Sequence, residues 1–270
     1  MNNALQIALL CYKESLHHKL IYGILTISCL LMAFSVLISG LFMRDILKII
    51  LDICLAATTI GGLLVPFFLA VNVLAGDIDQ KTIYTILAKQ VSKPSYIIGK
   101  FLGLGMLTAT IMGMLTIATL LAVATAYSIY PSAFFVDLSI SSILITIIIK
   151  SLGILVLNSV VLLWSAVTTS TFLVTLLTLL TYFIGQTVED VVRFITLNPE
   201  GIEFTALMET IAKGSLYIFP NLAAFDFSYQ AAYGLPIPIG LIGIAVLYGT
   251  AYIAAIISLT TFLFQRRDLP

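Results

Sequence analysis

Long runs of apolar residues that contain no charge alternate with short polar segments along most of the chain. Uncharged runs of 24 residues extend from Leu20 to Met43 and from Ile53 to Gly76, and one of 36 residues extends from Phe101 to Val136. A helix needs about 20 apolar residues to cross the ~30 Å hydrocarbon core of a bilayer. The pattern therefore predicts membrane-spanning helices rather than the half-polar elements of a soluble fold.

We predict an all-α polytopic membrane protein with six transmembrane helices in one domain. The predicted spans are residues 20–43, 53–76, 96–127, 139–164, 169–187 and 236–264. The turn before the fifth span, Ser165 to Thr171, carries no charge, and joining the two spans on either side of it would leave five. Six spans keep both ends of the chain on the same side, so we prefer six.

Composition agrees with this class. Apolar residues make up 60% of the chain and charged residues 10%, whereas a soluble domain carries about 25% charge. Cys11, Cys29 and Cys54 lie in or beside apolar segments with no CxxC spacing, which favours buried thiols over a disulfide or metal site.

The distribution of basic residues predicts which side each loop occupies, because cytoplasmic loops of membrane proteins are enriched in lysine and arginine. Eight basic residues fall on one side of the predicted topology and four on the other. The richer side holds both chain ends and the segment between the second and third spans. We therefore expect cytoplasmic N- and C-termini.

The first residues, 4–19, place apolar side chains on one side of a helix and end in a basic cluster, Lys13, His17, His18 and Lys19. This pattern is typical of an interfacial helix that lies along the membrane surface. His17 and His18 are not a convincing metal site, since adjacent helical side chains point about 100° apart and no further ligand is near.

Residues 77–95 form the longest polar stretch on the predicted cytoplasmic side. Ile83, Ile86 and Leu87 recur at helical spacing, which predicts a short amphipathic helix with one apolar face. Pro94 is expected to end it, because the residue before a proline is disfavoured in the helical region. An exposed apolar helix face on this side indicates a docking surface for a soluble partner.

The same stretch carries a recognisable pattern: Asp77, then Thr82-Ile83, Leu87-Ala88, Val91-Ser92-Lys93-Pro94, and the closing Gly99-Lys100. It resembles the loop between the second and third helices of ABC-2 type permeases, with Gln90 where that family often has proline and Lys93 where it often has arginine. The resemblance implies a type V exporter-like fold in which this loop is the coupling helix. By resemblance, the residues that dock on the ATP-binding subunit are Asp77, Thr82, Ile83, Ile86, Leu87 and Lys93.

The resemblance also implies partners. Two copies of an ABC-type ATP-binding subunit would hold ATP and Mg²⁺, and a second permease copy or a close homologue would complete the membrane unit. The expected location is the cytoplasmic (inner) membrane of a bacterium or archaeon, with membrane lipid around the protein and no nucleic-acid partner.

Residues 188–235 are the longest predicted segment outside the membrane, on the extracytoplasmic side. They contain Phe219-Pro220-Asn221-Leu222, Phe225-Asp226 and Tyr233-Gly234-Leu235-Pro236. These elements resemble those before the last helix of permeases in the multicopper-enzyme and nitrous-oxide-reductase maturation group, in which a Phe264-x-Arg266-Arg267-Asp268-Leu269 tail is also common. An extracytoplasmic partner protein is therefore expected to contact this segment.

Polar or irregular positions inside the spans are the candidates for gating or translocation: Lys150, Asn72 and Pro66. Lys150 has two interpretations. Its distance from Trp164 places it in the outer third of the fourth span, from which its long stem can extend to the surface. The alternative is a role in substrate handling or gating, as expected of an ionisable residue inside a membrane.

The chain contains no motif for chemistry of its own. Gly99-Lys100 is not part of a phosphate-binding loop, and no HExxH, CxxCH or Ser-His-Asp arrangement occurs. We therefore predict a non-catalytic subunit without a bound cofactor or metal. The alternative hypotheses are an ion-gradient-driven secondary transporter and a membrane scaffold without transport. The cargo stays open among lipid, peptide and sulphur-containing molecules.

Overall fold

The computed structural model describes residues 3–17, 19–42, 45–71, 92–168, 170–197 and 206–266. Helices make up nearly all of these ranges, and no strand occurs in them. The elements are α1 (Asn3–Leu16), α2 (Lys19–Ser39), α3 (Ile46–Leu64), η1 (Val65–Ala70), α6 (Lys93–Ile129), η2 (Ser132–Phe135), α7 (Ile140–Val167), α8 (Thr171–Leu197), α9 (Ala206–Ile218), η3 (Ala223–Phe225), α10 (Ser228–Ala232) and α11 (Ile239–Arg266).

Six helices in the described part of the chain are long and apolar enough to cross a membrane. They are Ile21–Ser39, Ile46–Phe68, Lys93–Ile129, Ile140–Val167, Thr171–Leu197 and Ile239–Arg266. The predicted class, an all-α polytopic membrane protein with six spanning helices, is confirmed at this level. The uncharged turn is also present, since α7 ends at Val167 and α8 begins at Thr171.

Some helices are longer than the membrane spans predicted within them, because they continue past their uncharged runs. The second span was predicted from residue 53, but α3 begins at Ile46 and carries Lys48 and Asp52 in its first turns. The fifth was predicted to end at 187, but α8 continues to Leu197 through Glu189 and Asp190, which are exposed. A charge-free run marks the part suited to hydrocarbon, and a helix can extend beyond it into a polar environment.

The start of α6 also differs from the prediction, which placed Pro94 at the end of the preceding helix. Lys93 is the first residue of α6, and the Ser92 side chain accepts a hydrogen bond from the Ser95 backbone N–H. Proline is tolerated in the first helical turn because its missing N–H would have no intrahelical partner there. The predicted coupling segment 77–95 therefore overlaps α6 in its last residues.

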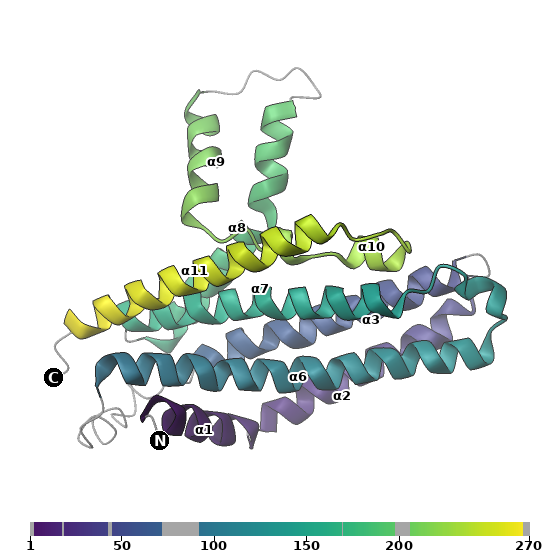
Figure 1. Ribbon diagram of the computed structural model, residues 1–270, viewed down its shortest axis with the longest axis horizontal. Helices are drawn as coiled ribbons and strands as arrows, with labels where there is room; N and C mark the ends of the chain where they lie inside the picture. The colour runs from purple at the N-terminus through teal and green to yellow at the C-terminus, as the bar shows by residue number, and fades with distance from the viewer. Residues whose placement is uncertain are drawn as a thin grey trace.

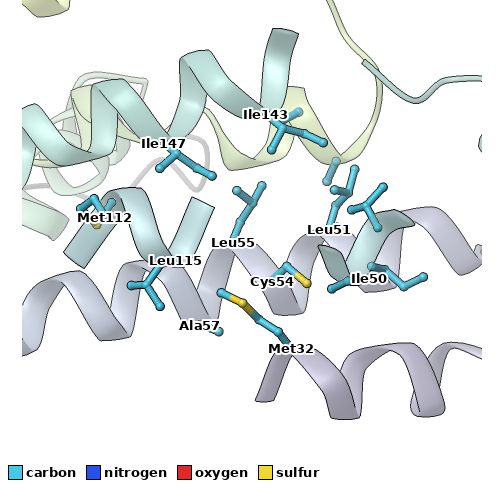
Figure 2. Close-up of a cluster of buried hydrophobic side chains, with 14 of the residues drawn as sticks. Met32, Ile50, Leu51, Cys54, Leu55, Ala57, Met112, Leu115, Ile143 and Ile147 are labelled. Carbon is cyan, nitrogen blue, oxygen red and sulfur yellow. The ribbon is translucent and has the colours of Figure 1, made fainter. Parts of the chain in front are cut away.

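The long helices α3, α6, α7 and α11 run along the longest axis of the molecule (Figure 1). A hairpin made of the end of α8 and of α9 projects away from this bundle. The largest buried cluster lies where α2, α3, α6 and α7 meet; Figure 2 labels Met32, Ile50, Leu51, Cys54, Leu55, Ala57, Met112, Leu115, Ile143 and Ile147. Since lipid is as apolar as these side chains, close packing rather than water exclusion stabilises such a cluster.

The second spanning helix is irregular around Pro66. The α-helix α3 gives way directly to a π-helix, η1, and Pro66 lies in its first turn. Proline lacks the N–H that an α-helical hydrogen bond requires, and a local π-helix is one way to accommodate the loss.

Helix α1 (Asn3–Leu16) covers most of the predicted range 4–19 and packs against the first half of α6. Two glycines of α6 allow the contact. A Cβ atom at Gly99 would lie 2.7 Å from the Ala4 carbonyl oxygen, and one at Gly103 would lie 2.8 Å from the Ala8 carbonyl oxygen. The position of α1 at a membrane surface stays a prediction.

The α1–α6 contact generates a prediction with a control in the same helix. We expect Gly103→Ala to lower the free energy of unfolding by about 1–3 kcal/mol, because the added methyl group meets α1 backbone that cannot rotate away. Gly113→Ala should be neutral or slightly stabilising, since nothing lies within 4 Å of its added Cβ and alanine favours helix. Thermal unfolding of the purified protein in detergent would measure both.

A second readout reports on α1 itself. Cys11 is buried against Gly103, so Gly103→Ala should speed the reaction of the Cys11 thiol with a maleimide in a Cys29→Ser background. Equal stability and equal labelling of the Gly103 and Gly113 variants would contradict the tight contact.

Candidate functional site

Residues 220–227, here called the crossing segment, pass between three helices on their way from α9 to α10. The Leu222 N–H donates to the Gly185 carbonyl of α8 at 2.9 Å. The Asn221 N–H donates to the Tyr248 hydroxyl of α11 at 2.8 Å, and the Thr146 hydroxyl of α7 donates to the Phe227 carbonyl at 3.3 Å. The crossing segment is therefore hydrogen-bonded to α7, α8 and α11 at once.

Glycines on the same three helices make room for this backbone. A Cβ at Gly185 would lie 2.4 Å from the Pro220 carbonyl oxygen. One at Gly153 or Gly249 would lie 3.0 Å from side-chain atoms of Phe225, which is 2% exposed. The Pro220–Asp226 sequence motif noted above is thus the part of the segment that is embedded in the bundle.

An ion pair between a buried lysine and an exposed aspartate joins the crossing segment to the membrane helices. The Lys150 Nζ of α7 lies 3.3 Å from Asp226 Oδ1 and donates to the Thr59 hydroxyl of α3 at 2.6 Å. Lys150 is 7% exposed. The interpretation that its side chain ends at the protein surface is therefore wrong, because the ammonium is satisfied inside the protein.

Asp226 lies outside the spanning helices and has further partners. Its Oδ1 accepts a hydrogen bond from the Ser228 N–H at 2.9 Å, and its side chain is 39% exposed. Burial by itself raises the pKa of the Asp226 carboxyl, but the nearby Lys150 ammonium and the hydrogen bonds from Ser228 outweigh it, so the pKa is lowered. Asp226 is therefore ionised at neutral pH and forms a true ion pair.

Two cavities flank this pair, and Asp226 lines both. One, of about 50 Å³, is bordered by Lys150, Tyr182, Gln186 and Asp226, and has room for one or two waters. The other, of about 510 Å³, lies between α8, α9, α11 and the crossing segment. The crossing segment and its ion pair therefore separate a small internal space from a larger outer one.

The charged groups of the site are Lys150 and Asp226, and they form a polar contact. Among the described residues no group of three or more His, Cys, Asp or Glu side chains could hold a metal ion. The site brings together charges, glycines and aromatic rings, and it contains no activated nucleophile.

Sequence reasoning selected Lys150 but missed its partner. Asp226 belongs to the distinctive Phe225-Asp226 element, and an ionisable residue inside a span implies a counter-charge. Those two signals lie far apart in the chain, and nothing in the sequence connects them.

Of the other predicted residues, the structure describes Pro66 and Lys93. Asp77, Thr82, Ile83, Ile86, Leu87 and Asn72 are outside the described residues. Pro66 lies in η1, and the Lys93 Nζ donates to the Gln265 carbonyl near the end of α11 at 3.2 Å. Lys93 and Pro66 are therefore not part of the Lys150 site.

The chain segments on either side of residues 72–91 meet in a second buried cluster, here called the junction. It contains Ile7 of α1, Val71, Tyr96 of α6 and Phe264 of α11. The Tyr96 and Phe264 rings stack with centroids 6.1 Å apart. Four elements that are distant in sequence thus converge where the predicted coupling segment leaves and re-enters the bundle.

A scan against protein-family models finds no match to this chain, and a search of curated proteins finds none either. The class of protein is therefore defined by the structure itself: an all-α polytopic membrane protein with an ion pair between a buried lysine of a membrane helix and the segment that precedes the last span.

The ion pair predicts non-additive effects of mutation. Lys150→Met and Asp226→Asn each leave one charge without its partner. Each should lower the free energy of unfolding by about 2–3 kcal/mol, less than for a fully buried pair because Asp226 is partly exposed. The double variant should be more stable than the sum of the single changes predicts. The measurement is a double-mutant cycle of thermal or denaturant unfolding in detergent.

The exposed pair Asp45–Lys48, with its atoms 3.0 Å apart, is the matched control. Asp45→Asn should leave the unfolding midpoint unchanged, because exposed pairs contribute little. Additive effects of the Lys150 and Asp226 changes would show that the two side chains do not interact.

The lowered pKa of Asp226 predicts a loss of stability in acid. A carboxyl whose pKa is lower in the folded state stabilises the fold above its unfolded pKa of about 3.9, and this contribution is lost as the pH falls from there through the folded pKa. Wild-type protein should thus lose more thermal stability between pH 6 and pH 3 than the Lys150→Met/Asp226→Asn double variant. Identical pH profiles would mean that Asp226 is not held ionised.

Proposed function

We propose that the chain is the permease subunit of an ABC-2 type transporter. Two copies, or one copy and a close homologue, would work with two ATP-binding subunits that hold ATP and Mg²⁺. The proposal is supported by the coupling-loop resemblance of residues 77–100, by the six spanning helices and by the helix that precedes the first span.

The observation that carries the proposal is the junction. The described residues next to the predicted docking residues 77–87 in the chain are Val71 and Ser92. Val71 packs in one cluster with Ile7, Tyr96 and Phe264. A force applied to the segment by ATP-driven closure of the partner subunits would act directly on η1 and α6. It would reach α1 and α11 through the buried contacts of the same cluster.

Helix α6 is suited to transmit such a force. It has 37 residues, which at 1.5 Å per residue corresponds to roughly 55 Å. It packs against α1, α2, α3, α7 and α11. A tilt of this helix would therefore change its packing against most of the bundle.

On the extracytoplasmic side, this movement would either export a cargo or pass a conformational change to a partner protein. The basic-residue distribution supports cytoplasmic chain ends in an inner membrane, which puts the crossing segment and the large cavity toward the outer side. The crossing segment contacts three spanning helices, so their rearrangement would change the shape of the large cavity.

The docking prediction can be tested with charged substitutions. Ile83→Glu and Leu87→Glu should abolish co-purification of the ATP-binding subunit, because they place charge on the apolar face that would be buried in the complex. Membrane insertion should be unchanged, since these residues lie outside the spans. Affinity purification from native membranes, with identification and quantification of the co-purifying chains, is the measurement.

Tyr84→Glu provides the control, since Tyr84 is assigned to a different face of the same predicted helix. Retention of the ATP-binding subunit by the Ile83 and Leu87 variants would show that docking occurs elsewhere. Purification of the wild-type chain alone, under conditions that preserve complexes, would argue against the class.

An ion-gradient-driven secondary transporter is the second candidate, and one observation favours it. The buried Lys150 of a spanning helix forms an ion pair with Asp226, and transporters of that class use ionisable residues within the membrane to couple ion movement to substrate. Such a protein would move cargo in vesicles without any ATP-binding subunit, and the Lys150→Met/Asp226→Asn variant would lose that movement.

A further inference from the structure

The 510 Å³ cavity is lined by both apolar and polar side chains. Leu216 of α9 and the α11 residues Leu241, Ile244 and Ala245 are apolar, whereas Glu189, Asn221, Asp226 and Gln230 are polar. Its volume falls within the range of small-molecule sites, about 300–1,000 Å³. The cavity is therefore large enough and mixed enough to bind an amphipathic molecule.

The apolar wall leads to the surface that would face lipid. Leu241 and Ile244 line the cavity, yet they are 48% and 66% exposed on α11, which is one of the spanning helices. A ligand with its head in the cavity could thus lay its hydrocarbon tail along α11 without entering water. Access from the membrane requires no opening of the bundle.

The charged side chains on the polar wall are acidic. The charged residues among those described around the cavity are Glu189 and Asp226, and both are acidic. Asp226 is already paired with Lys150 from the other side. Glu189 accepts a hydrogen bond at 2.7 Å from the amide of Asn221, a neutral group that brings no counter-charge to the carboxylate. An additional cation at this site would meet Glu189.

The same residue favours a head group that donates hydrogen bonds. A carboxylate has two oxygens with about four acceptor positions, and Asn221 occupies one of them on Glu189. A primary ammonium has three N–H donors and a positive charge, so it matches Glu189 in both charge and hydrogen bonding.

We propose that this cavity binds the primary ammonium head of an amphiphile whose apolar tail lies along α11. Two sources share this chemistry, a membrane aminolipid such as phosphatidylethanolamine and a free long-chain amine. An anionic lipid without an amine is disfavoured, because its phosphate would face Glu189. The site does not depend on ATP or on docking of another subunit, so it can be tested on the purified chain alone.

Native mass spectrometry of the protein in detergent would measure binding of four probes: phosphatidylethanolamine, phosphatidylglycerol with the same acyl chains, dodecylamine and dodecanol. Glu189→Gln removes the charge and keeps an oxygen that can accept from Asn221, so the fold should be retained. Asp190→Asn is the matched control, since Asp190 is the adjacent exposed acid and does not line the cavity.

We expect the amine probe that fits the site to bind wild-type and Asp190→Asn protein equally and Glu189→Gln about tenfold more weakly, as for the loss of a charge-assisted hydrogen bond. Ala224→Phe, which fills the cavity, should weaken the same probe. If binding of phosphatidylethanolamine depends on Glu189, the site is one for aminolipids. If only binding of dodecylamine depends on Glu189, the site is one for free amines.

The proposal is overturned if Glu189→Gln and Asp190→Asn bind both amine probes alike. It is also overturned if phosphatidylglycerol binds as tightly as phosphatidylethanolamine and dodecanol as tightly as dodecylamine, since the head group would then not be recognised. Unchanged thermal unfolding of Glu189→Gln would confirm that its effect is on the ligand.

Discussion

Every polar group inside a membrane must find its partner within the protein, and the arrangement of this chain depends on that constraint. Most hydroxyl groups in the spans satisfy it locally, as when Thr108 and Thr119 donate to carbonyls one turn earlier in α6. Other polar groups make contacts between helices. Lys150 to Thr59 ties α7 to α3, and Asn158 to Thr108, at 2.9 Å, ties α7 to α6. These contacts specify which helices lie together, whereas the apolar side chains around them could pack in many ways.

The crossing segment follows from the same constraint. Non-helical backbone can lie beside spanning helices only where other parts of the protein satisfy its N–H and C=O groups. Here α7, α8 and α11 each supply a hydrogen-bonding group, and Gly153, Gly185 and Gly249 supply the space. Because the partners belong to three helices, the segment is held only while those helices keep their spacing. The ion pair and the two cavities beside it share this dependence.

Charge and hydropathy along the sequence were sufficient to predict six helices, since a long uncharged apolar run is typical of a membrane-spanning helix. Helix ends were not predictable in the same way, because Lys48, Asp52 and Glu189 are compatible with helix once the chain leaves hydrocarbon. Pro66 was found from its chemistry, which is local. The Lys150–Asp226 pair was not found, because it depends on how the segment before the last span returns to α7. The coupling residues 77–87 were selected by resemblance and remain a prediction.

The junction and the crossing segment are connected by one continuous helix, α11. Helix α11 contributes Phe264 to the junction and Tyr248 and Gly249 to the crossing segment. These positions are 16 residues apart, or roughly 24 Å along a continuous helix. A displacement of α11 at the junction must therefore be matched by a displacement where Asn221 and Phe225 contact it, unless the helix bends. The large cavity has α11 as one wall and the crossing segment as another. Its shape thus depends on the position of α11, whose C-terminal end packs in the junction.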